Sequence, residues 1–218
     1  IVLETIPVWD AFRASDECPV CTLMEKAEKD ALSYYLSSAI MTPEVRVETN
    51  ENGFCPYHFI LLSKEGKPQS LALLMDTYYG KDQEIFSPYF TSIKKAGNAR
   101  KALKAAEGFR SALSEREKGC LICSRMKDRE DRYLYTIASL WNEDSAFRSF
   151  FNSSKGLCMH HTALLSENRG EPLSGPSLLS FLQDLFSLLE RNLERVRKDD
   201  WWMTQKYKSE NKDKPWNG

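Results

Sequence analysis

Residues 17–62 read ECPVCTLMEKAEKDALSYYLSSAIMTPEVRVETNENGFCPYHFILL, and residues 119–165 read GCLICSRMKDREDRYLYTIASLWNEDSAFRSFFNSSKGLCMHHTALL. The two stretches align cysteine with cysteine and histidine with histidine, at an offset of 102 residues that one inserted residue later raises to 103. The aligned pairs are Cys18 with Cys120, Cys21 with Cys123, Cys55 with Cys158, and His58 with His161. Because all six cysteines fall into matched pairs, the pattern predicts one structural unit used twice.

Each stretch predicts a helical hairpin. We expect a first helix from the CxxC motif to about Ile40, and its counterpart from about Leu121 to Trp141. The CxxH motif then opens a further helix in each half. Residues 45–49 alternate like a strand, but the sequence offers this segment no obvious partner. The predicted class is therefore all-α.

The rest of the chain also carries helical signals. We expect helices at roughly 69–79 and 88–117 between the halves, and a closing helix at about 176–207 whose leucines recur every three or four residues. The predicted organisation is a single helical domain over 1–218, with pseudo-repeats at about 17–65 and 119–167. The apolar face from Leu178 to Val196 is expected to pack across both hairpins and to join them.

The cysteines and histidines have the spacing of zinc ligands. Zinc takes four tetrahedral ligands from thiolate sulfur and imidazole nitrogen, and residues at i and i+3 in the first turn of a helix point the same way. We therefore predict two Zn²⁺ ions per chain, each bound by the four donors of one half. The predicted ligand sets are Cys18, Cys21, Cys55 and His58 in the first half, and Cys120, Cys123, Cys158 and His161 in the second.

Three other interpretations of these residues stay open. A lone CxxC is also the motif of a thioredoxin-type redox pair, although that leaves Cys55 and His58 unexplained. The cysteines could be buried without a ligand, or they could hold an iron–sulfur cluster with a histidine ligand. His160 aligns with Tyr57 rather than with His58, so a supporting or surface position is expected for it.

Composition limits the classes of partner. The 218 residues are 42% hydrophobic, which is enough for a sizeable core, and the formal net charge is −1. A near-neutral total gives no global reason to expect nucleic acid, and no apolar run approaches the ~20 residues of a membrane span. The first residue is Ile1, so we expect a missing or processed native start. The few, ligand-patterned cysteines favour a reducing compartment, the cytoplasm.

A local basic cluster is the exception to this neutral balance. Five cations gather near Gly97-Asn98: Lys94, Lys95, Arg100, Lys101 and Lys104. We interpret them as the solvated face of a helix, with weak nucleic-acid binding as the alternative.

With these residues in hand, the chain resembles an uncharacterised family of bacterial proteins classed as a domain of unknown function. The shared marks are Thr5-Ile6-Pro7, ECPVC, PEVRVETNENGFCPYH, NSSKGLCMHH and the ending NKDKPWNG. The resemblance implies a duplicated helical architecture and a cytoplasmic location, and it implies no activity.

We therefore favour a zinc-stabilised scaffold or interaction module over an enzyme, with a protein partner and either a monomer or a homodimer. The alternatives are a zinc-dependent enzyme or a redox-responsive zinc–thiolate switch.

Overall fold

The computed structural model describes residues 4–216, and the predicted all-α class is confirmed, because no strand occurs in this range. The long helices are α2 (Pro19–Tyr35), α5 (Pro68–Lys94), α6 (Ala99–Lys118), α7 (Leu121–Glu143) and α10 (Gly175–Lys206). The shorter elements are α1 (Thr5–Arg13), η1 (Ser38–Met41), α3 (Pro43–Asn52), α4 (Pro56–Lys64), α8 (Ser145–Ser153), α9 (Met159–Ser166) and η2 (Ser209–Asn211). The last two residues of the family-like ending, 217 and 218, lie outside the described residues.

Several elements differ from the sequence expectation. The alternating segment 45–49 lies within α3, because Pro43 and Glu44 start a helix well and place Val45 and Thr49 on its buried side. The first hairpin helix, α2, ends at Tyr35. The 3₁₀ helix η1 (Ser38–Met41) follows it as a separate element. Residues 80–87 continue α5 instead of interrupting it.

The chain divides into two compact units, and both boundaries fall inside helices. The terminal unit comprises residues 1–25 and 129–218, and the central unit comprises residues 26–128. One boundary lies within α2 and the other within α7. Each unit has its own buried apolar cluster.

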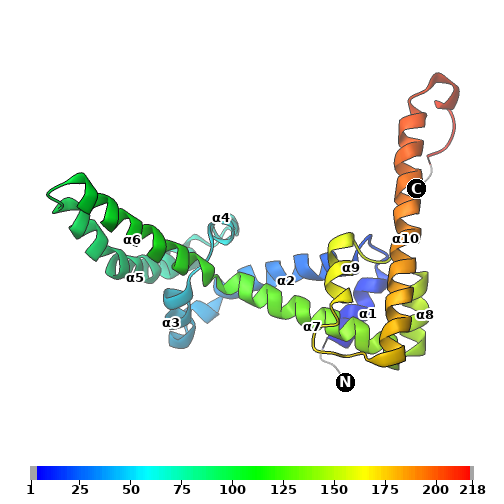
Figure 1. Cartoon of the computed structure of the whole chain (residues 1–218), viewed down its shortest axis with the longest axis horizontal. Coiled ribbons are helices and arrows are strands. Elements are labelled where there is room, and N and C mark those ends of the chain that lie inside the picture. The colour runs from blue at the N-terminus through cyan, green and yellow to red at the C-terminus, as the bar shows by residue number, and fades with distance from the viewer. Residues whose placement is uncertain (1–3, 217–218) are drawn as a thin grey trace. The chain divides into compact units, whose positions relative to one another are not determined.

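The core of the terminal unit is aromatic. The largest fully buried side chains there are Phe12, Trp141, Phe147, Phe151 and Phe181. The Trp141 and Phe181 rings meet edge to face with centroids 5.1 Å apart, a favourable geometry for aromatic pairs. α10 packs against α8 and α9, and α1 packs against α8 (Figure 1).

The central unit is built around the antiparallel hairpin of α5 and α6 (Figure 1). α3 contacts both helices of the hairpin, and α4 contacts α5. The buried Arg116 of α6 ties this arrangement together. Its Nη1 donates to the backbone oxygen of Asn50 at 3.0 Å, it forms an ion pair with Asp82, and its guanidinium lies 4.3 Å from the centre of the Tyr78 ring.

The closing helix is buried over a shorter stretch than expected. On α10, Phe181, Leu185 and Leu188 are buried, whereas Leu193 and Val196 are exposed. The expectation that one covered face runs from Leu178 to Val196 is therefore wrong. The physical reason is that α10 meets α8 and α9 only along its first half, and its later turns extend past them.

Candidate metal centres

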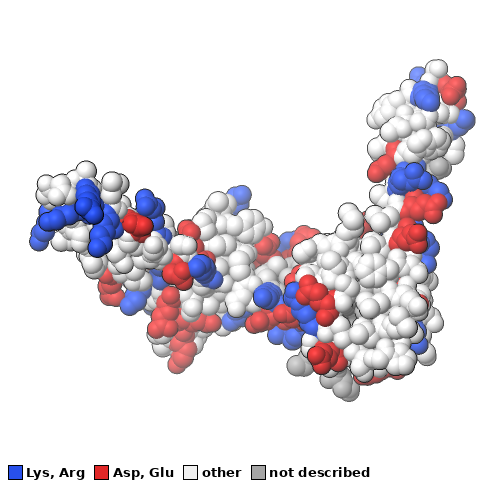
Figure 2. Space-filling model, in the orientation of Figure 1, with Lys and Arg blue, Asp and Glu red and all other residues white. Residues whose placement is uncertain are grey.

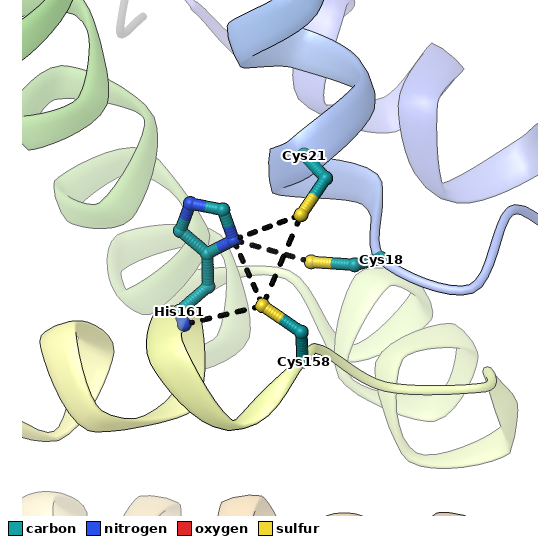
Figure 3. A group of neighbouring side chains, drawn as sticks. All are labelled: Cys18, Cys21, Cys158 and His161. Carbon is teal, nitrogen blue, oxygen red and sulfur yellow. Dashed lines mark hydrogen bonds between the residues drawn. The ribbon is translucent and has the colours of Figure 1, made fainter. Parts of the chain in front are cut away.

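In the terminal unit, four side chains converge on one point. These four form the terminal cluster: Cys18, Cys21, Cys158 and His161. The two first cysteines come from the start of α2, and the other two residues come from the start of α9 (Figure 3). The Nδ1 atom of His161 lies 3.4 Å from the sulfur of Cys18, 3.3 Å from that of Cys21 and 3.2 Å from that of Cys158.

The central unit holds a second cluster of the same composition. The central cluster comprises Cys55, His58, Cys120 and Cys123. The Nδ1 atom of His58 lies 3.2, 3.3 and 3.4 Å from the sulfurs of Cys55, Cys120 and Cys123, in that order. Residues that align between the two halves are buried to the same degree. The first cysteine of each CxxC and both histidines are buried, and the second cysteine of each CxxC is exposed.

The structure corrects the predicted grouping of these eight residues. Each cluster combines the CxxC of one half with the CxxH of the other half, so the expectation of one site per half is wrong. A local contact explains the exchange in the central unit. The N–H of Leu121, inside the second CxxC motif, donates to the backbone oxygen of Gly53 at 3.1 Å and holds the first CxxH motif beside it.

The donor spacing is that of a tetrahedral metal site. Zinc with sulfur at about 2.3 Å and nitrogen at about 2.0 Å places two sulfurs about 3.8 Å apart, and sulfur and nitrogen about 3.5 Å apart. The sulfurs of Cys21 and Cys158 are 3.8 Å apart, as are those of Cys55 and Cys123. All six thiols are free of disulfides, so every donor is available to a metal ion.

A carboxylate stands behind each histidine. The Nε2 atom of His58 lies 3.3 Å from a carboxylate oxygen of Glu28, and that of His161 lies 3.4 Å from an oxygen of Glu130. A carboxylate that accepts the Nε2 proton leaves Nδ1 free to bind metal and fixes the ring. The sequence analysis missed both residues, although Glu28 and Glu130 align at the same offset of 102 as the CxxC motifs.

One glycine stands before each CxxH motif. Gly53 precedes Cys55 by two residues, and Gly156 precedes Cys158 by two residues. Their φ angles are +72° and +81°, a region that side chains with a Cβ rarely adopt. A Cβ on Gly53 would also lie 2.4 Å from the Tyr78 ring.

Burial changes the proton affinity of the donors. It raises the pKa of the Cys21 and Cys123 thiols from 9.0 to about 12, and it lowers the pKa of both His58 and His161. At neutral pH these thiols are therefore protonated and these imidazoles are neutral. A cation that binds here must displace thiol protons, and the N–H groups of the helix starts then help to stabilise the thiolates.

The terminal cluster borders a groove. The groove has a volume of about 530 Å³ and lies along the second half of α10, with Cys18, Cys158, Met159, Leu193 and Val196 among its lining residues. Its rim carries an ion pair between Lys155 and Glu17 at 3.0 Å. His160, the single histidine outside the two clusters, is exposed, as expected.

These features define the class as an all-helical protein with two Cys₃His clusters that could each hold a metal ion. A family model described as a family of unknown function (DUF6062) matches residues 2–218, and the chain belongs to that family. Neither the comparison with curated proteins nor that with solved structures gave a match. Among residues 4–216, no helix is both long enough and apolar enough to cross a membrane.

Proposed function

We propose that each cluster binds one Zn²⁺ and that the two ions fasten an intracellular scaffold or interaction module that has no catalytic activity of its own. The observation that carries the proposal is the donor geometry, three sulfurs and one imidazole nitrogen within 4.8 Å of one another in each cluster. Four protein ligands fill a tetrahedral zinc ion, as in structural sites, whereas catalytic sites keep a position for water or substrate.

Each zinc ion would link segments of the chain that are far apart in the sequence. In the terminal cluster it joins the start of α2 to the start of α9, whose donors Cys18 and His161 are 143 residues apart. In the central cluster it joins the starts of α4 and α7. Metal binding of this kind contributes directly to folding, on the order of 10–16 kcal/mol of apparent binding free energy at neutral pH.

Metal analysis of two double variants tests both the zinc and the grouping. Cys21→Ser with Cys158→Ser removes two donors of the terminal cluster, so we expect one zinc per chain to remain. Cys21→Ser with Cys55→Ser removes one donor from each cluster, so we expect both ions to be lost or greatly weakened. The wild-type chain should carry two.

The matched design separates the competing arrangements. If each half bound its own ion, the results of the two double variants would be exchanged. A folded wild-type chain with no zinc after purification without chelator would contradict the proposal altogether.

A redox-responsive zinc–thiolate switch is the second candidate function. The observation that favours it is that Cys21 and Cys123 are exposed and lie 3.8 Å from Cys158 and Cys55. Hydrogen peroxide would take two electrons from each thiolate pair, form one disulfide and, with two protons, become two water molecules. Mass spectrometry after peroxide treatment should then find these two disulfides and released zinc. Unaltered thiols would leave only the structural role.

A further inference from the structure

The positive charge of the central unit is concentrated at one end of the α5–α6 hairpin. No Asp or Glu occurs between Glu84 and Glu107, and this stretch carries five cations. They are Lys94, Lys95, Arg100, Lys101 and Lys104, and all are exposed. Figure 2 shows basic side chains gathered at this end of the hairpin.

Within residues 4–216, none of the five cations forms an ion pair. Other lysines of the chain are paired, such as Lys81 with Glu84 and Lys198 with Glu194. The amino end of α6 lies at the same place, with no acidic residue in its first turn. The carboxyl end of α5 lies there too, so the two helix dipoles largely cancel and the positive potential comes from the side chains. The unpaired cations of such a surface repel one another, and a bound anion lowers this repulsion.

The shape of this surface indicates which polyanion it fits. Four cations and one carboxylate line one open depression along α6, which leaves it with a net positive charge: Arg100, Lys101, Lys104 and Arg110, with Glu107. Arg100 and Arg110 are ten residues apart, or about 15 Å along the helix axis. A concave, elongated row of cations suits the convex, regularly charged backbone of a nucleic acid. A bilayer is flat and takes up protruding apolar groups, and Leu103 is the only large apolar residue that lines this depression.

We propose that this basic surface, Arg100, Lys101, Lys104 and Arg110 with the flanking Lys94 and Lys95, binds the phosphate backbone of nucleic acids without sequence preference. The interaction is electrostatic, because the residues that line the depression include no aromatic side chain to stack on bases. The proposal is independent of zinc, since none of these residues is in a cluster.

The test measures binding of the full zinc-loaded chain to a short labelled duplex and to the matching single strand over a series of salt concentrations. Six phosphate contacts, one for each cation of the basic surface, predict a slope of log K against log salt of about −5.4 for the duplex and about −4.2 for the single strand. The triple variant R100Q/K101Q/K104Q should reduce the duplex slope to about −2.7 and lower the affinity at about 50 mM salt at least tenfold.

A second triple variant, R13Q/K81Q/K198Q, is the matched control. It also removes one arginine and two lysines, but these cations are paired with Asp10, Glu84 and Glu194 outside the basic surface. It should bind like the wild type, and both variants should keep their zinc content and circular dichroism.

Three outcomes would overturn the proposal. The first is equal loss in both variants, and the second is no binding at low salt. The third is binding to phosphatidylserine vesicles without binding to nucleic acid, which would assign the surface to a membrane instead.

Discussion

At the scale of single residues, Glu28 and Glu130 show how one helix serves two clusters. Each glutamate follows the second cysteine of its CxxC by seven residues on the same helix. α2 supplies Cys18 and Cys21 to the terminal cluster and Glu28 to the central one, and α7 supplies the complementary set. The carboxylates are also partly buried, which strengthens their hydrogen bonds to the histidines.

Substitution of Glu28 by Gln tests this supporting role. An amide is a weaker acceptor for the Nε2 proton of His58, so we expect the zinc affinity of the central cluster to fall by about 10–100-fold. The terminal cluster should be unaffected. Competition with a chromophoric chelator would resolve the two ions.

The reciprocal variant Glu130→Gln is the control, because it should weaken the terminal cluster and spare the central one. Equal weakening of both ions by either variant would show that the carboxylates act through general stability and not through their own histidine.

At the scale of elements, α10 combines a buried half with an exposed half. Phe181 and Leu185 lie within the core of the terminal unit, whereas Leu193 is 46% exposed and Trp201 is 62% exposed. The end of the helix is stabilised by its own continuation, since the Nδ2 of Asn211 donates to the backbone oxygen of Gln205 at 3.0 Å. The stability contributed by α10 should therefore come mainly from its first half.

Two identical substitutions on α10 measure that contrast. Leu185→Ala removes a side chain that is 1% exposed, so the unfolding free energy should fall by about 2–5 kcal/mol. Leu193→Ala changes a half-exposed position and should cost less than about 1 kcal/mol. Denaturant titration of the zinc-loaded chain would give both values. Similar losses would mean that the second half of the helix is also covered, for example by another copy of the chain.

Much of the element structure could be predicted from sequence, and the exceptions have local causes. The starts of α4 and α9 follow from the CxxH motifs, and the positive φ angles of Gly53 and Gly156 follow from their glycines. The alternation of residues 45–49 was ambiguous, because Val45 and Thr49 fit a strand face and also the i, i+4 spacing of a helix. The apolar periodicity of α10 predicts an apolar face, but it does not indicate how much of that face the neighbouring helices cover.

At the scale of the whole molecule, the eight donors could be predicted by residue type and spacing, but their grouping could not. The repeat alignment identifies Cys18 with Cys120 as equivalent positions, and equivalence is not contact. Which CxxH meets which CxxC depends on tertiary contacts such as that of Leu121 with Gly53, which the sequence does not display. The carboxylates were missed because a glutamate on an exposed-looking helix has no distinctive motif.

The pKa shifts predict that the metal-free chain loses stability at both ends of the pH range, whereas the zinc-loaded chain loses it only in acid. Because burial raises the pKa of Cys21 and Cys123 to about 12, the metal-free fold loses their contribution as pH rises from about 9 towards 12. The lowered pKa values of His58 and His161 favour the fold above about 6.5, and this contribution is lost as pH falls. Bound zinc would hold the thiolates ionised, so a zinc-loaded chain should keep its stability at high pH and lose both metal and stability in acid.

Thermal unfolding between about pH 4 and 12, with and without a chelator, would measure this difference. Zinc release should accompany the acid transition of the loaded chain. Superimposable pH profiles of the two forms would contradict a metal-coupled fold.

The exchanged grouping of donors also matters while the chain is being made. On the ribosome, Cys18, Cys21, Cys55 and His58 emerge before any donor of the second half. Cys120 follows His58 by 62 residues, or about 3 to 12 seconds of translation at about 5–20 residues per second. During that interval the nascent chain contains a complete set of four ligands that the finished fold does not use together. Zinc bound by this first set would therefore have to change ligands when Cys120 and Cys123 appear, and maturation of such a chain would require ligand exchange at the metal as well as folding of the polypeptide.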